Sequence, residues 1–219
     1  MNIIIQCAAS KRPNAGMLRS ATGRTVMFVA EPQLAPRGGE LLYARPDDMA
    51  DDRRTWRDVL LQANQEPADN PLGLLAAMDL YENPAYRRLA QRFGMDRLFI
   101  LSAGWGLIRT NFLTPAYDIT FSSSAEPFKR RGKGAPYRDF NMLPVNSDEP
   151  VLFLGGKDYL PLFDRLTASI PGQRIVLYNS NIAPRLPKAF LQRFVTTTRT
   201  NWHYECAQAL IDGRIRLPV

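Results

Sequence analysis

The chain has 219 residues, 45% hydrophobic and 22% charged, which is an ordinary composition for a globular protein and enough length for one α/β domain with a substantial core. No stretch approaches the roughly 20 apolar residues that span a bilayer, and the run at residues 3–5 is too short for a signal peptide, so we expect a cytoplasmic protein without membrane contact. The net charge of +7 favours nucleic acid as a partner, whereas two cysteines and one histidine exclude a disulfide framework and a zinc site built on several histidines.

In chain order, the first half predicts strands that alternate with helices. Residues 31–39, with two prolines and a Gly-Gly pair, are expected to be a loop. The apolar spacing predicts strands over 2–7, 25–30 and 98–101, and helices over 51–65 and from Asn83-Pro84 to Gly94.

The second half continues this alternation after a long interruption. Residues 119–150 form an irregular, basic segment, and loops of that length are usually functional or disordered. Beyond it, the sequence predicts strands over 151–154 and 174–178, and helices after Gly156, over 188–194 and over 204–211. We therefore expect a single α/β domain over residues 1–219, with a mainly parallel sheet flanked by helices and no internal repeat.

The turn after the first strand is the first candidate site. It reads Cys7-Ala8-Ala9-Ser10-Lys11 and places a hydroxyl and an ammonium at the carboxyl edge of the sheet. Ser10 and Lys11 are candidates to hold a phosphate or a carboxylate. The alternative is a solvated turn, and the missing glycines exclude a Walker loop.

The turn after the strand at 98–101 is the second and most informative candidate. Ser102-Ala103-Gly104-Trp105-Gly106 follows a buried apolar run, and ligands of open α/β sheets bind at that edge. An exposed Trp105 would be a platform on which a base stacks, and a buried one would be part of the core. Ser102, Tyr117 and Asp118 would converge if the intervening loop folds back.

Three further segments carry candidates with plainer alternatives. Gly155-Gly156-Lys157-Asp158-Tyr159 suits an anion at a helix N-terminus, or is a tight strand-to-helix joint with Tyr159 in the core. Residues 201–205 include the single histidine, His203, as a possible general base, or are a capped helix start. The basic loop with Lys129, Arg130, Arg131 and Lys133 would hold a phosphate backbone, or is a solvated charge run.

The segment at 98–109, LFILSAGWGLIR, followed by PAYD at 115–118, resembles the hallmark segment of the YaaA-like peroxide-stress proteins, approximately L-S-G-x-Y-G-x-L-R-P and then P-Y-R. Residues 7–11 and 155–159 resemble that family's S-P-A-K-T turn and its later small-residue turn. The chain is closer to a related group of bacterial and phage domains with C-S-x-x-K and S-A-x-Y-G-L motifs. The resemblance implies an α/β fold, DNA binding and a role in limiting oxidative damage to DNA. It covers about a third of the chain, and the family's basic C-terminal segment is not evident.

Three functional hypotheses follow. The first is a DNA-associated protein that receives a nucleotide or flipped base in a pocket at the strand ends. The second is an enzyme on a small nucleotide or nucleoside, for example at the N-glycosidic bond, and the third is a redox-responsive protein that uses Cys7. No cofactor and no metal are expected. The catalytic candidates are Ser10, Lys11, Ser102 and Asp118. The expected binding residues are Cys7, Ser10, Lys11, Ser102, Trp105, Gly106, Tyr117, Gly155, Tyr159, Lys129, Arg130, Arg131 and Lys133.

Overall fold

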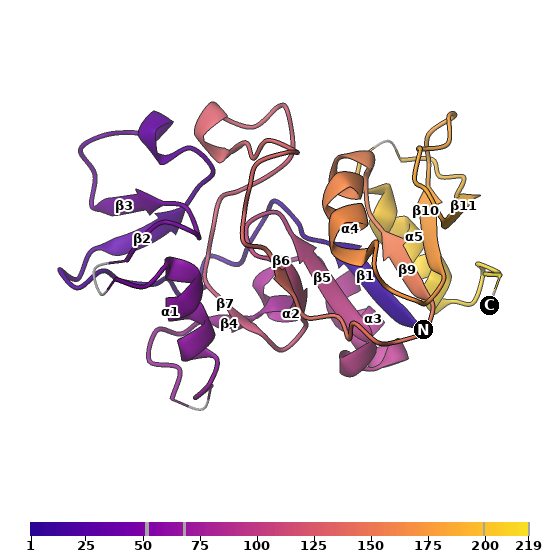
Figure 1. Ribbon diagram of the computed structural model, residues 1–219, viewed down its shortest axis with the longest axis horizontal. Coiled ribbons are helices and arrows are strands. Elements are labelled where there is room, and N and C mark those ends of the chain that lie inside the picture. Colours follow the sequence, from indigo (N-terminus) through magenta and orange to yellow (C-terminus); the bar gives the residue numbers. More distant parts are fainter. Residues whose placement is uncertain (51–52, 68, 199, 219) are drawn as a thin grey trace.

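The computed structural model describes residues 1–50, 53–67, 69–198 and 200–218. They form a single α/β domain around a seven-stranded sheet with the order β11-β10-β9-β1-β5-β6-β8 (Figure 1). The strands of this sheet are β1 (Asn2–Gln6), β5 (Leu98–Ser102), β6 (Gly106–Arg109), β8 (Phe140–Asn141), β9 (Val151–Leu154), β10 (Arg174–Tyr178) and β11 (Ala189–Arg193).

Five neighbouring strands of this sheet are parallel. β1 lies in the middle, with Ile3 opposite Leu98 of β5 on one side and opposite Leu152 of β9 on the other. β10 and β11 continue in the same direction, whereas β6 is antiparallel to β5 and β8 runs parallel to β6. Since β1, β5 and β9 are buried on both faces, their sequences are almost continuously apolar, as a central parallel sheet requires. The expected fold class is confirmed.

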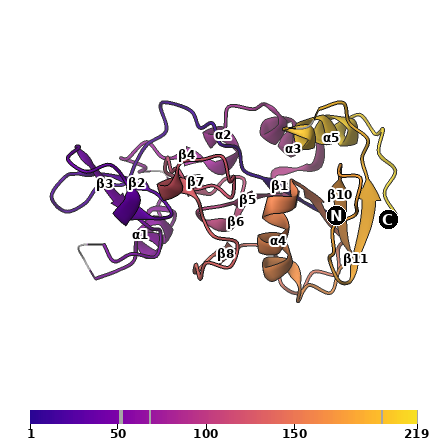
Figure 2. The same cartoon turned by 90° about the horizontal axis from the view of Figure 1, so that it is seen from above.

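Helices cover both faces of the sheet, as Figure 2 shows from above. α3 (Ala85–Phe93) and α5 (Trp202–Ile211) pack together on one face, and α4 (Leu160–Thr167) lies on the other. Each helix presents apolar side chains inward, such as Tyr86 on α3 and Phe163 on α4. The connection from β1 to β5 contains α3 and so covers one face of the sheet. The connection from β9 to β10 contains α4 and covers the other face.

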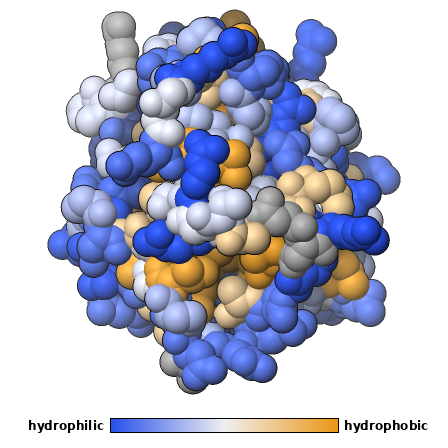
Figure 3. Space-filling view, turned by 90° about the vertical axis from the view of Figure 1, so that its left-hand side faces the viewer, coloured by the Kyte–Doolittle hydropathy of each residue, from blue (hydrophilic) through white to orange (hydrophobic). Residues whose placement is uncertain are grey.

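Short elements extend from the middle of the molecule to its left-hand end in Figure 1. They are β2 (Thr25–Phe28) and β3 (Leu41–Ala44), which form a parallel pair, with α1 (Trp56–Ala63), β4 (Leu75–Ala76), α2 (Ala77–Leu80) and β7 (Leu113–Thr114). Short 3-10 helices lie at Pro32–Leu34, Met95–Arg97, Pro127–Lys129 and Lys157–Tyr159. Figure 3 shows this end as a hydrophilic surface interrupted by an apolar patch.

Two expectations about elements need correction. Residues 188–194 are not a helix, because β11 pairs there as a parallel edge strand with β10. Its two faces alternate, with Phe190 exposed while Ala189 and Leu191 pack on the core. A stretch this short fits both the two-residue period of a strand and the 3.6-residue period of a helix. The helix expected at 51–65 is shorter, since α1 begins after a capping box in which Thr55 and Asp58 bond each other's backbone. Residues 51 and 52 lie outside the described part of the chain.

In the described part of the chain, no helix has the length and apolar character that a membrane crossing requires.

Candidate functional site

A crevice of about 320 Å³ opens at the carboxyl edge of the sheet, beyond the ends of β1 and β9. Four segments far apart in the sequence meet there. They are the residues after β1, residues 120–122, the residues after β9 and the start of α5 with the two residues before it. The lining residues are Gln6, Cys7, Ala8, Ala9, Thr120, Ser122, Gly156, Asp158, Tyr159, Thr200, Asn201, Trp202, His203 and Tyr204.

The position of the crevice follows from the order of the strands. β1 connects onward to β5 on one side of the sheet, while β9 connects to β10 on the other. The loops after β1 and β9 therefore diverge and leave a space between them. In open α/β sheets this switch point is where ligands bind.

Hydrogen bonds fix the floor of the crevice. The Cys7 Sγ and the Tyr159 hydroxyl lie 3.1 Å apart and share a hydrogen bond. The Gln6 side chain accepts from the Gly156 N–H at 2.6 Å and so ties the two turns together. Burial raises the pKa of Tyr159 well above its ordinary value, so the phenol stays neutral at physiological pH.

The wall on the α5 side is aromatic. The Tyr204 hydroxyl lies 3.1 Å from that of Tyr86, which donates to the Gln6 carbonyl at 2.9 Å. The His203 ring packs against Tyr204, with 4.1 Å between the centroids. Burial lowers the pKa of His203 to about 4, so its imidazole is neutral.

Two further hollows adjoin the crevice on either side. One, of about 300 Å³, shares Ala8, Ala9, Asn201 and Tyr204 with it and is also lined by Ser10, Glu82 and Asn83. The other, of about 280 Å³, lies beside Gly155, Lys157 and the end of β10. Of the predicted site residues, Cys7 and Tyr159 thus line the crevice itself, and Ser10 and Gly155 line its extensions.

Gly155 has a structural reason to be glycine. A Cβ there would come within 2.3 Å of the Phe153 ring. The first glycine of the pair is therefore set by packing.

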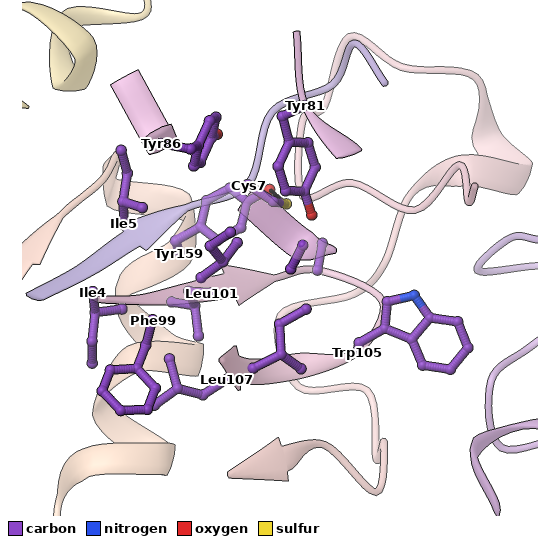
Figure 4. Close-up of a cluster of buried hydrophobic side chains, with 14 of the residues drawn as sticks. Ile4, Ile5, Cys7, Tyr81, Tyr86, Phe99, Leu101, Trp105, Leu107 and Tyr159 are labelled. Carbon is purple, nitrogen blue, oxygen red and sulfur yellow. Dashed lines mark hydrogen bonds between the residues drawn. The ribbon is translucent and has the colours of Figure 1, made fainter. Parts of the chain in front are cut away.

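The turn after β5 is not a ligand-binding loop but the buried end of a hairpin. Ser102 pairs with Gly106 across it, and both residues are buried. Trp105 is 0% exposed and packs edge-on against Phe28 at 5.0 Å, so it is part of the core and offers no face to a base. Figure 4 shows Trp105 pointing away from Cys7 and Tyr159. Of the two alternatives for Trp105, the core residue is therefore correct, and its predicted role in binding a base is wrong.

Polar groups inside this turn are bonded to one another. Ser102 Oγ accepts from the N–H groups of Gly104 and Trp105 at 3.2 and 3.1 Å and donates to the Tyr117 hydroxyl at 2.9 Å. The Tyr117 hydroxyl also lies 2.9 Å from that of Tyr81. The loop thus folds back to join Ser102 and Tyr117 as expected, but as a buried structural network.

Two buried arginines hold the outer side of the turn. Arg57 donates to the carbonyls of Trp105 and Gly104 at 3.0 and 3.1 Å. Arg131 donates to the Ala103 carbonyl at 2.7 Å and pairs with Asp139 through two bonds of 2.8 and 2.6 Å. Arg131 was expected to contact a phosphate backbone, and its burial excludes that role.

The other charges of the basic loop are largely paired. Lys129 contacts Asp118 and Glu126 at 2.7 and 2.6 Å, and these hydrogen bonds raise the pKa of Lys129. Lys133 contacts Asp158 at 2.7 Å. Only Arg130 of the four predicted contacts is exposed without an ion pair among the described residues. Asp118 is an ion-pair partner of Lys129 and is not part of the hydrogen-bond network of Ser102.

Lys11 lies under the same loop and is not among the residues that line the crevice. Its Nζ is 4.1 Å from the centroid of the Tyr117 ring. Burial lowers the pKa of this ammonium, although Cys7 and Asp118 act in the opposite direction. Lys11 thus contacts Tyr117, whereas Ser10 lines the hollow beside the crevice.

Sequence reasoning missed part of the crevice. Thr120 and Ser122 line it from the irregular segment, and no local pattern marks them. Residues 201–204 carried a signal in their density of functional side chains, but a capped helix start was the plainer interpretation. In the described part of the chain, no three His, Cys, Asp or Glu residues are grouped to hold a metal.

Comparison of the chain with protein-family models, curated proteins and solved structures finds no match. The resemblance to YaaA-like proteins therefore stays a prediction.

Proposed function

We propose that the crevice between β1 and β9 binds a nucleobase-containing ligand, either a nucleotide or a nucleotide flipped out of a nucleic acid. The observation that carries this proposal is the position of the crevice at the switch point of the sheet. Its volume of about 320 Å³ falls at the lower end of the range for small-molecule sites, which suits a single base with its sugar.

The lining supports a base rather than an aliphatic ligand. Trp202 and Tyr204 from α5 and Tyr159 from the turn after β9 make a large part of the lining aromatic. Asn201, Thr120 and Ser122 supply hydrogen-bonding groups at the rim. A few polar groups on an aromatic surface are typical of sites that read the edge of a base while stacking on its face.

A steric block at Ala9 tests this proposal. Ala9 is exposed and lines the crevice, so Ala9→Trp fills the space without opening the core. We expect it to lower the affinity for nucleosides and nucleoside monophosphates by about tenfold or more, measured by titration calorimetry. Ala168→Trp is the matched control, since Ala168 is exposed at the C-terminal end of α4. Equal binding by both variants, or no binding of any nucleoside by the unaltered protein, would refute the proposal.

DNA association is the second candidate, favoured by the net charge of +7. Paired charges in the basic loop argue for a small ligand instead, because Lys129 and Lys133 already neutralise acids of the same chain. Gel shifts on duplex and single-stranded DNA at low salt separate the two. Binding that weakens steeply with salt and is reduced by Ala9→Trp would favour a flipped nucleotide.

A further inference from the structure

The first turn of α5 forms one wall of the crevice and is uncapped. Asn201 precedes the helix with a φ of 59° and its side chain makes no capping bond. Among the described residues, the backbone N–H groups of Trp202 and His203 have no acceptor. A helix N-terminus with free N–H groups attracts anions through its partial positive charge.

His203 gives an independent sign that a ligand group is missing there. The residue lines the crevice from the same turn, yet it is only 2% exposed. Its Nε2 is buried and has no hydrogen-bond partner in the described part of the chain. Buried polar groups are rarely left unpaired, because each costs free energy.

The two carboxylates near the turn already have partners in the chain. Glu205, the acid in the first turn, bonds the hydroxyls of Thr196 and Thr198 and does not line the crevice. Asp158 faces the crevice but is already paired with Lys133 at 2.7 Å. The remaining polar side chains nearby include the hydroxyls of Thr120, Ser122 and Thr200 and the Asn201 amide, all of which carry donors.

We infer that the first turn of α5, together with His203, is a phosphate subsite of the crevice, so that the ligand is a nucleotide and not a nucleoside or a free base. This inference rests on the proposed function for the rest of the ligand. The phosphate would accept from the backbone N–H groups of the turn, beside the neutral imidazole. Tyr204, Tyr159, Cys7 and Asp158 are the other titratable groups that line the crevice around it.

His203 is the only histidine in the chain, so its imidazole is a unique NMR reporter. We would titrate 15N-labelled protein at fixed ionic strength with inorganic phosphate, with the common 5′-monophosphates and with the matching nucleosides. An anion close to an imidazole favours the protonated form, so phosphate-bearing ligands should raise the pKa of His203 by about one to three pH units. Nucleosides should shift the resonances without that rise.

Two variants locate the phosphate. His203→Gln should weaken binding of monophosphates by about ten- to a hundredfold and weaken nucleoside binding by much less. Lys157→Gln, on the turn after β9, should have the smaller effect. A larger effect of Lys157→Gln would move the phosphate to that turn and overturn the inference.

The outcomes separate this inference from the proposed function. If nucleosides and monophosphates bind equally and the pKa of His203 does not change, the phosphate subsite is wrong and the proposed function stands. If inorganic phosphate alone acts on His203 and no nucleoside or nucleotide binds, the subsite stands and the proposed function is wrong. If neither acts, both are wrong.

Discussion

Ser102 is the residue on which the most conspicuous segment of the sequence depends. Its hydroxyl bonds two backbone N–H groups and one phenol, all inside a turn closed to solvent. Gly104 and Gly106 complete the turn for steric reasons. A Cβ on Gly104 would lie 3.1 Å from the Tyr117 ring, and Gly106 has a φ of +91°. The S-A-G-W-G segment is therefore explained by the packing of a hairpin rather than by ligand binding.

Replacing Ser102 tests this explanation. Ser102→Ala leaves the N–H groups of Gly104 and Trp105 buried without an acceptor, and we expect a loss of about 1 to 3 kcal/mol in the free energy of unfolding for each. Urea denaturation measures the loss. Ser123→Ala, at an exposed serine whose side chain makes no described bond, should stay within about 0.5 kcal/mol of the unaltered protein. Similar losses in both variants would contradict the structural role.

Only some of the site residues were predicted correctly from the sequence. Cys7 and Tyr159 were predicted at the pocket because each follows an apolar strand, and they do meet at 3.1 Å. Trp105 satisfied the same rule and is nevertheless buried. The sequence does not show that the chain after β5 reverses at once, since the pairing of β6 with β5 is a contact between segments.

Among the elements, the segment at 119–150 differs most from its expected role. It is not a loop of unpaired charges. Residues 119–150, which we call the strap, lie against the hairpin of β5 and β6, and the strap's strand β8 pairs with β6. Arg131 anchors it, with its side chain 1% exposed and that of Asp139 2% exposed. Arg131 also stacks on Tyr137, with the guanidinium 3.8 Å from the ring centroid.

Removing this anchor should loosen the strap and destabilise the domain. Arg131→Met leaves Asp139 buried with Arg165 as its remaining partner, and breaking a buried pair costs about 3 to 5 kcal/mol. Urea denaturation is again the measurement. Lys133→Met removes an exposed pair in the same strap and should cost about 1 kcal/mol or less. A cost for Arg131→Met as small as that for Lys133→Met would show that the strap is not anchored there.

Elements with a clear pattern were predicted, and short ones were not. β1, β5, β9 and β10 are strands of four or five mainly apolar residues between turn signals, and their positions were correct. β11 was predicted as a helix because its half-buried edge position gives a mixed pattern. β3, β6 and β8 are fixed by partners elsewhere in the chain, which a local pattern does not contain.

For the whole molecule, the parallel sheet was predictable and the site only partly so. The alternation of strands and helices implies that the ends of β1, β5 and β9 share one edge. It does not give the strand order, and the order decides that the opening lies between β1 and β9. It also does not show that the last helix, α5, begins at this edge and brings His203 to the crevice.

The buried His203 links the crevice to the pH dependence of global stability. Its pKa is lowered from 6.5 to about 4 in the folded protein by burial. Between these pH values the unfolded chain binds a proton that the folded protein does not, so the free energy of unfolding falls as the pH is lowered through this window. The full difference corresponds to about 3 kcal/mol at 1.36 kcal/mol per pH unit.

We expect His203→Gln to lose this part of the pH dependence, so that the difference in stability between the two proteins changes between pH 7 and 4. Urea denaturation across this range measures it. Curves that stay parallel would show that His203 titrates with an ordinary pKa and that its imidazole reaches solvent.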